Sequence, residues 1–227
     1  MNPLSTPTGT STETAAFEEA VSKIVDVVYR HPLHRELYLK ALDYCLEERA
    51  VDEAELFLEG QPEYKNALQT STALVNVLIE QGGLAYAEYD SSGALLTEER
   101  VEQFFEQGRN EDEIYDMVER RCVQTTEEGR ATAILLDPVK RVRSYVASDP
   151  RRSDTFCKLL AFCSTPRSLE EINEAFDSDP ALAAREKTGW QRVHASYLID
   201  RMNEAGGLTW NNGWQTTPAG AALVADR

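Results

Sequence analysis

The feature that most constrains this chain is a set of three short sequence blocks that occur twice, in the same order. Residues 40–45 (KALDYC) are similar to residues 158–163 (KLLAFC), residues 81–86 (QGGLAY) to 205–210 (AGGLTW), and residues 124–129 (QTTEEG) to 215–220 (QTTPAG). A single match of this kind arises easily by chance. Three matches in the same order predict that one structural module occurs twice in the chain.

The second copy indicates what this module is. A helical pattern over residues 188–205 ends at Gly206 and Gly207, and two short strands then flank Asn212 and Gly213. An Asn-Gly pair supplies the positive φ values that a two-residue hairpin turn requires. We therefore expect helices followed directly by a tight β-hairpin.

Three helices, Gly-Gly-Leu, a short hairpin and Gln-Thr-Thr-x-x-Gly resemble the winged-helix (winged helix-turn-helix) superfamily, which is found in many bacterial regulators. The resemblance covers most of residues 33–227 and is one of fold, not of a particular family. It implies an α+β, mainly helical chain with two tandem winged-helix domains, the first with an insertion in its wing. Because winged helices also serve as protein-interaction modules, the resemblance alone does not establish DNA binding.

Composition and periodicity predict the domain organisation. The wing insertion follows from spacing: 41 residues separate Gly83 from Gln124, but 8 separate Gly207 from Gln215. We expect the third helix of the first domain over residues 63–81. The expected segments are a disordered tail (1–14), an N-terminal helix that packs within the chain or dimerises (15–32), a first winged-helix domain (33–138) with its insertion (90–120), a basic linker helix (139–153) and a second winged-helix domain (154–227).

The net charge of −16 is unevenly distributed along the chain. Residues 1–120 contain 9 Lys and Arg against 25 Asp and Glu, whereas residues 121–227 contain 14 of each. Affinity for duplex DNA comes largely from neutralising phosphates, so the first domain is expected to bind DNA poorly. A simple role of the acidic residues in solubility is the alternative.

The third helix of the second domain is the expected site of DNA reading. Helical spacing places Leu198, Ile199 and Met202 on its core side. The opposite face and the wing carry aromatic residues of the kind that is typical of protein interfaces. Packing of Trp190 and Tyr197 against the first domain or the N-terminal helix is the alternative. The candidate DNA-binding residues are Arg185, Lys187, Gln191 and Arg192, and the candidate interface residues are Trp190, Val193, Tyr197, Trp210 and Trp214.

A concentrated basic stretch lies between the two copies. It could contact phosphates or an acidic partner, or rest on the acidic first domain. Its members are Lys140, Arg141, Arg143, Arg151 and Arg152.

Other classes of protein receive little support. No apolar run is long enough for a bilayer and the N-terminus lacks an apolar signal core, so we expect a cytoplasmic protein without a membrane partner. Without a phosphate-binding loop, a nucleophile elbow or an HExxH motif, we expect no enzyme, catalytic residue, metal or cofactor; His31 and His34 are a weak metal signal. We expect reduced, buried thiols, with a disulfide or zinc site at the last two cysteines as the alternative, at Cys45, Cys122, Cys157 and Cys163.

Two functions remain open on this basis. The first is a DNA-binding transcriptional regulator of winged-helix type that binds DNA through the second domain. The alternative is an acidic tandem winged-helix adaptor that binds a protein partner or a second copy of itself without direct DNA binding. Its layout and acidity resemble those of the accessory subunits of chromosome-organising complexes.

Overall fold

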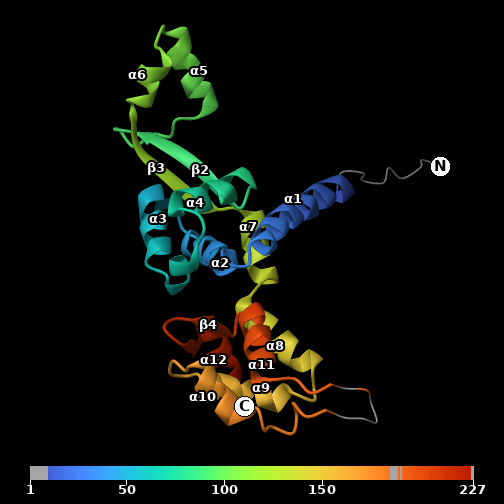
Figure 1. Ribbon diagram of the computed structural model, residues 1–227. Helices are drawn as coiled ribbons and strands as arrows, with labels where there is room; N and C mark the ends of the chain where they lie inside the picture. The colour runs from blue at the N-terminus through green and yellow to red at the C-terminus, as the bar shows by residue number, and fades with distance from the viewer. Residues whose placement is uncertain (1–9, 185–188, 190, 226–227) are drawn as a thin grey trace, which may run out of the picture. The chain divides into compact units, whose positions relative to one another are not determined.

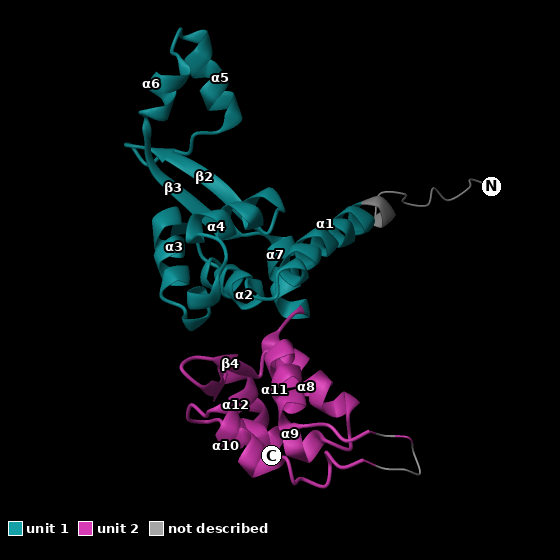
Figure 2. Cartoon of the chain, in the orientation of Figure 1, with its two compact units in different colours: residues 1–135 teal, residues 136–227 magenta. Residues whose placement is uncertain are grey.

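The computed structural model of this chain describes residues 10–184, 189 and 191–225. The fold is mixed α+β and mainly helical, as expected, with two small antiparallel sheets. The chain divides into two compact units, unit 1 (Met1–Leu135) and unit 2 (Leu136–Arg227), which Figure 2 colours separately.

Unit 1 consists of helices around a three-stranded sheet with the strand order β1-β3-β2. Strand β3 pairs with both neighbours in antiparallel fashion, with Arg49 opposite Val123 and Leu84 opposite Thr125. The elements, shown in Figure 1, are α1 (Thr10–Arg30), α2 (Arg35–Tyr44), β1 (Arg49–Ala50), α3 (Val51–Glu59), the 3-10 helix η1 (Pro62–Asn66), α4 (Ser71–Glu80), β2 (Leu84–Asp90), α5 (Glu98–Glu106), α6 (Glu111–Tyr115), β3 (Val118–Thr125) and α7 (Glu127–Leu135).

Unit 2 has the same order of helices before a shorter hairpin. Instead of a first strand it has a single antiparallel bridge, in which Arg167 and Trp214 exchange backbone hydrogen bonds at 3.0 and 2.7 Å. The elements are α8 (Pro138–Ser148), α9 (Ser153–Phe162), α10 (Leu169–Phe176), α11 (Ala195–Ala205), β4 (Leu208–Trp210), β5 (Trp214–Thr216) and α12 (Pro218–Ala225).

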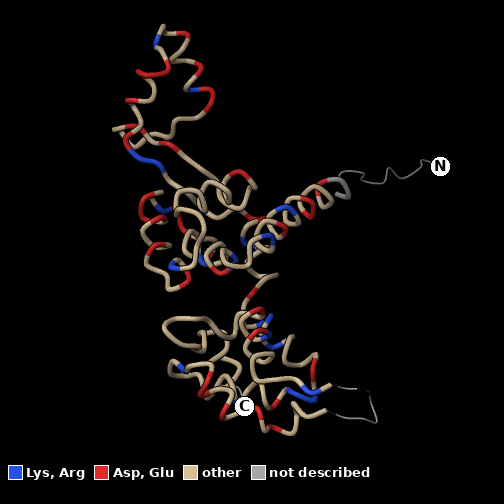
Figure 3. Tube along the Cα trace, in the orientation of Figure 1, with Lys and Arg blue, Asp and Glu red and all other residues tan. Residues whose placement is uncertain are grey.

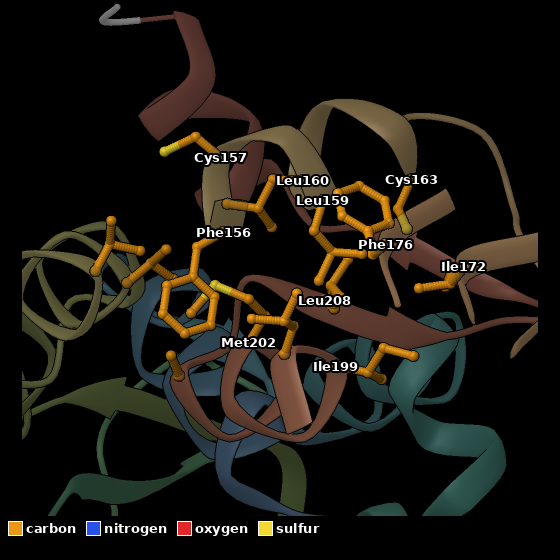
Figure 4. Close-up of a cluster of buried hydrophobic side chains, with 14 of the residues drawn as sticks. Phe156, Cys157, Leu159, Leu160, Cys163, Ile172, Phe176, Ile199, Met202 and Leu208 are labelled. Atoms are coloured by element: carbon orange, nitrogen blue, oxygen red, sulfur yellow. The ribbon is translucent and has the colours of Figure 1, made fainter. Parts of the chain in front are cut away.

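The core of unit 2 shows why this order of elements holds together. Figure 4 shows Phe156 and Leu160 of α9 beside Met202 of α11 and Leu208 of β4, and all four are buried. Burying such side chains stabilises the fold by roughly 1.5–3 kcal/mol each. The helices and the start of the hairpin therefore share one core.

The returning strand of each hairpin is attached to the unit through a Thr-Thr pair. In unit 1 the Thr125 amide donates to the carbonyl of Cys45 at 2.8 Å, and its hydroxyl donates to the carbonyl of Leu42 at 2.6 Å. The second threonine, Thr126, donates its amide to the carbonyl of Gly83 at 3.1 Å. The equivalent bonds in unit 2 run from Thr216 to Cys163 and Leu160 at 2.8 and 2.6 Å, and from Thr217 to Gly207 at 3.0 Å.

The closing helix of each unit crosses the paired-glycine segment at very short range. A Cβ added to Gly129 of α7 would lie 2.2 Å from the carbonyl oxygen of Gly83. A Cβ added to Gly220 of α12 would lie 2.4 Å from the carbonyl oxygen of Gly207. No side chain fits at either crossing, so glycine is required for close approach.

Helices α1 and α8 occupy the same position in their units. The ideal Cβ of Gly83 lies 3.5 Å from Ile24 of α1, and that of Gly207 lies 3.4 Å from Val142 of α8. Ile24 and Val142 are both fully buried, and 118 positions separate them, as they separate residues 40–45 from 158–163. Each helix therefore belongs to the core of its own unit.

This position corrects the prediction of a basic linker over residues 139–153. Helix α8 buries Val142 and Val146 in the core of unit 2, so it is a structural helix and not a connection between domains. The expected N-terminal helix likewise extends further than predicted, because α1 begins at Thr10. Residues 10–14 of the expected disordered tail are thus helical, and residues 1–9 lie outside the described part.

Two helix boundaries differ from the prediction because side chains start new helices, and the hairpin turn differs in length. The expected helix over 63–81 is divided into η1 and α4, since the Thr70 hydroxyl caps α4 by accepting from the Ala73 amide. Helix α11 begins only at Ala195, whose amide donates to the Asp177 carboxylate at 2.8 Å. The hairpin turn has three residues instead of two, since Trp210 pairs with Trp214.

Candidate functional site

All four candidate DNA-binding residues precede α11 in the sequence. Arg185, Lys187 and Trp190 lie outside the described residues. Gln191 and Arg192 are exposed but precede the helix, and the Arg192 guanidinium donates to the carbonyl of Asp177 at 3.3 Å. The prediction that Gln191 and Arg192 belong to the third helix was therefore wrong.

Helix α11 itself presents a face without an unpaired cation. Its exposed residues are Ser196, Asp200, Asn203 and Glu204. Its one basic residue, Arg201, is half-buried and forms an ion pair with Glu204 at 2.5 Å. Two carboxylates on this face would repel the phosphates of a duplex.

Val193 and Tyr197 pack within unit 2. Both are half-buried against its core, and the Val193 amide donates to the carbonyl of Leu182 at 3.1 Å. The guanidinium carbons of Arg152 and Arg201 lie 5.3 and 5.6 Å from the centre of the Tyr197 ring. These contacts give Val193 and Tyr197 a structural role. Leu198, Ile199 and Met202 of α11 are buried in the same unit.

The β4–β5 hairpin of unit 2, the expected wing, is aromatic and carries no charge. Trp210 and Trp214 meet edge to face with ring centroids 5.4 Å apart; Trp214 packs on the core, whereas Trp210 is 48% exposed. Asn212 and Gly213 have φ values of 54° and 147° in the turn between them. Residues 208–216, all described, contain no Lys or Arg that could enter a minor groove.

The basic residues of the expected linker helix (139–153) mostly form contacts within unit 2. Arg141 donates to the carbonyl of Ala205 at 2.7 Å, and the buried Arg152 pairs with Asp149 at 2.7 Å. Arg151 donates to the carbonyl of Ala183 at 2.5 Å, while Lys140 and Arg143 are exposed on α8.

In unit 1 the third helix, α4, also lacks a basic face. Its exposed residues are Thr72, Asn76 and Glu80, and Ser71, Leu74, Val75 and Leu78 are buried. Such a surface offers a duplex neither phosphate contacts nor the arginines that read guanine.

The wing of unit 1 ends in a small lobe, residues 91–117, which we call the wing lobe. It contains helices α5 and α6, with 8 Asp and Glu against 2 Arg, and red predominates there in Figure 3. Within residues 91–117, all of which are described, Ile114 is the only buried residue. The wing lobe therefore has almost no core of its own.

A row of carboxylates along α5 is the feature that sequence reasoning missed. Glu98, Glu102 and Glu106 follow one another at intervals of four, so they line one side of the helix. Phe105 lies beside this row and is 45% exposed. The four-residue spacing of these glutamates is visible in the sequence, but the sequence analysis considered only the overall acidity of the first domain.

Large exposed apolar side chains are concentrated in unit 1. Among the described residues, 12 of the 14 belong to it. They are Phe17, Tyr29, Leu33, Leu46, Leu56, Leu68, Tyr86, Leu95, Phe105, Tyr115, Ile134 and Leu135, against Leu169 and Trp210 in unit 2.

The thiols and His34 are buried. All four cysteines are free and buried, which confirms the expectation of reduced thiols, and burial raises the pKa of Cys45 and Cys163 to about 11. A thiol of this kind is protonated and unreactive at neutral pH. His34 is buried and accepts from the Leu68 amide at 3.0 Å. The described residues contain no group of three or more His, Cys, Asp or Glu side chains placed to hold a metal.

Comparisons with protein-family models, with curated proteins and with solved structures found no match to this chain. Among the described helices, none combines the length and the apolar character needed to cross a bilayer. The case for a function therefore depends on the surfaces themselves.

Proposed function

We propose that this chain is a tandem winged-helix adaptor that binds other proteins, chiefly through unit 1. The order helix, short strand, helix, helix and hairpin, with sheet order β1-β3-β2, supports a winged helix in unit 1. The matched threonine bonds and glycine crossings support a second copy of the module in unit 2. The four free thiols fit a cytoplasmic protein.

The observation that carries the proposal is the surface of the third helices. A winged helix that reads DNA presents basic and polar side chains there to the major groove. Helix α4 exposes no Lys or Arg, and the only basic residue of α11, Arg201, is paired with Glu204. These helices thus lack the cations that DNA affinity requires.

The wings support the same conclusion. The wing of unit 2 is uncharged, and that of unit 1 ends in the acidic wing lobe. Exposed tryptophan and tyrosine, as at Trp210 and Tyr115, are typical of the anchors of protein interfaces.

The test is a titration of the full chain against a duplex of mixed sequence, at low and at physiological salt. We expect no saturable binding at either, although phosphate contacts are strongest at low salt. A variant with Asp200→Arg and Glu204→Arg is the control for sensitivity, because it builds a cationic face on α11 and should gain salt-dependent binding. Binding by the unaltered chain that weakens steeply with salt would contradict the proposal.

A DNA-binding regulator that acts through unit 2 is the second candidate. It is favoured by the basic residues that precede α11: Arg185 and Lys187 follow Ala183 closely in sequence, and Arg151 binds the carbonyl of Ala183. On this alternative, Arg185→Ser with Lys187→Ser should abolish duplex binding, whereas Lys140→Ser with Arg143→Ser, the same loss of charge on α8, should preserve most of it.

A further inference from the structure

The wing lobe has no counterpart in unit 2, where three residues close the equivalent hairpin. Unit 2 builds the same closing contacts without it. With Ile114 as its only buried residue, the wing lobe also adds little to the core of unit 1. Folding alone therefore gives no reason for these 27 residues, numbered 91–117.

The base of the wing lobe is nevertheless held in a defined position. The Asp90 carboxylate accepts from the amide and hydroxyl of Ser92 at 2.9 and 2.6 Å and from the Ala94 amide at 3.0 Å. It also pairs with Arg100 of α5 at 2.5 Å, and the Leu96 amide donates to the carbonyl of Glu88 at 2.8 Å. These bonds join α5 to the end of the hairpin.

The two helices of the wing lobe also have defined ends. Gly108, with φ of 83°, ends α5, and the Arg109 amide donates to the carbonyl of Phe104 at 3.1 Å. Asn110 and Glu113 form a capping box that begins α6. The sequence thus specifies a small, shaped element, although it provides almost no core for it.

An apolar surface of the wing lobe lies uncovered. Helix α5 has no buried residue, and Phe105 is 45% exposed, whereas Tyr115 of α6 has the Arg121 guanidinium 4.8 Å from its ring centre. Val101 lies one turn before Phe105 and continues the apolar stripe along α5. An unpartnered apolar stripe of this kind gains most when a partner helix covers it.

The charges around the stripe specify which partner fits. Glu98, Glu102 and Glu106 line its edge, and among the described residues none of them has an ion-pair partner. Like charges at intervals of four weaken a free helix, so a cationic partner relieves a repulsion that folding leaves in place. The arginines of the wing lobe are already engaged: Arg100 and Arg109 lie over the Phe104 ring, at 5.5 and 5.2 Å from its centre.

We infer that the wing lobe is a docking site for a basic amphipathic helix of a partner protein. The apolar face of that helix covers Val101 and Phe105, and its Lys or Arg residues, one turn apart, pair with the glutamate row of α5. This inference rests on the proposed adaptor function and names the class of partner and the surface that receives it.

The experiment measures binding of a fluorescent synthetic peptide to the full chain. The peptide is an amphipathic helix with a leucine stripe and lysines one turn apart, and its matched partner carries glutamate in place of every lysine. We expect saturable binding of the lysine peptide only. The triple variant Glu98→Lys, Glu102→Lys and Glu106→Lys should weaken it at least about tenfold, and Phe105→Ser about fivefold.

Two control variants separate docking from general attraction between opposite charges. Glu13→Lys, Glu18→Lys and Glu19→Lys make the same charge change on the exposed part of α1 and should alter binding less than about twofold. Replacement of residues 91–117 by Asn-Asn-Gly, the turn of unit 2, should abolish binding while circular dichroism shows a folded chain.

Different outcomes would overturn the docking site and the adaptor function. If the control variant on α1 weakens binding as much as the variant on α5, or if Phe105→Ser has no effect, the docking site is wrong. Duplex binding by the unaltered chain, together with peptide binding that still depends on Phe105, would overturn only the adaptor function. Absence of peptide binding in a chain that also ignores DNA would overturn only the docking site.

Discussion

Unit 1 carries 27 Asp and Glu against 11 Lys and Arg, whereas unit 2 carries 12 of each, so the whole net charge of −16 belongs to unit 1. The contacts that close the two units nevertheless agree to within a few tenths of an ångström. These contacts are hydrogen bonds and glycine crossings between backbone segments, which do not depend on surface charge. The comparison teaches that the same closing contacts form in two units whose surface charges differ widely.

The agreement extends to an arginine of each unit that pairs with the hairpin. Arg49 pairs with Val123 in unit 1 and lies over the Tyr44 ring at 5.2 Å. Arg167, 118 positions later, lies over the Phe162 ring at 4.5 Å. The same side chain thus covers the end of the same helix in both units.

The largest expected effect comes from the glycine crossings. Gly129→Ala and Gly220→Ala should each destabilise their own unit by about 3 kcal/mol, because the new Cβ would overlap a backbone oxygen. The three tryptophans all belong to unit 2, so tryptophan fluorescence follows unit 2 during denaturation. Hydrogen exchange by mass spectrometry follows unit 1.

The matched control is Gly60→Ala, where the nearest atoms lie at 3.5 Å and should tolerate the methyl group. If Gly129→Ala is as mild as Gly60→Ala while Gly220→Ala is severe, the two units are not closed in the same way.

An intermediate effect is expected at the second threonine of each pair. The Thr126 hydroxyl donates to the carbonyl of Gly82 and accepts from the Gly129 amide, and that of Thr217 makes the same two bonds with Gly206 and Gly220. Thr126→Val and Thr217→Val keep the side-chain shape but remove both bonds. Each should cost about 1–2 kcal/mol in its own unit. Thr126→Ser and Thr217→Ser, which keep the hydroxyl, should recover most of this, and unequal costs in denaturant titrations would weaken the comparison.

The smallest effect concerns a position where the units differ in chemistry. His34 and Arg152 both occupy the residue before a helix, α2 and α9 respectively, and both are buried. Burial, and to a lesser extent the neighbouring His31, lowers the pKa of His34 below its ordinary value of 6.5. Between the lowered pKa and 6.5 the unfolded chain binds more protons, so the stability of unit 1 should fall as the pH drops through this window.

His34→Gln is the control, because its side-chain oxygen can still accept from the Leu68 amide but carries no proton that titrates near neutrality. Denaturation of unit 1 measured between pH 7 and 5 (about neutral to mildly acidic) should lose most of its pH dependence in this variant. An unchanged pH dependence would assign the effect to other groups.

Much of the fold could be predicted from local chemistry. The fold is mainly helical as expected, a helix ends and a hairpin follows at Gly206 and Gly207, and Leu198, Ile199 and Met202 are buried where the helical pattern placed them. The free, buried cysteines also followed from the sequence. In each case the signal is periodicity or residue type within a single element, which a sequence displays directly.

The candidate site was harder to predict, because exposure depends on contacts between distant residues. Tyr197 was expected on an open face, but Arg152, 45 positions earlier, covers its ring. Basic residues such as Arg141 were expected to contact the acidic first domain, or else phosphates or an acidic partner, yet Arg141 binds the carbonyl of Ala205 within unit 2. A count of charged residues cannot show which Lys and Arg side chains already bond to other groups of the folded chain.

By itself the sequence determined the helical periodicity, the paired blocks and the uneven charge, because each is carried by neighbouring residues or by composition. Only the tertiary structure decided that α1 and α8 are equivalent core helices and that α11 begins at Ala195. The first depends on contacts of Gly83 with α1 and of Gly207 with α8. The second depends on the Asp177 carboxylate, which accepts from the Ala195 amide 18 residues later. Such contacts form only when the chain is folded, and no local pattern specifies them.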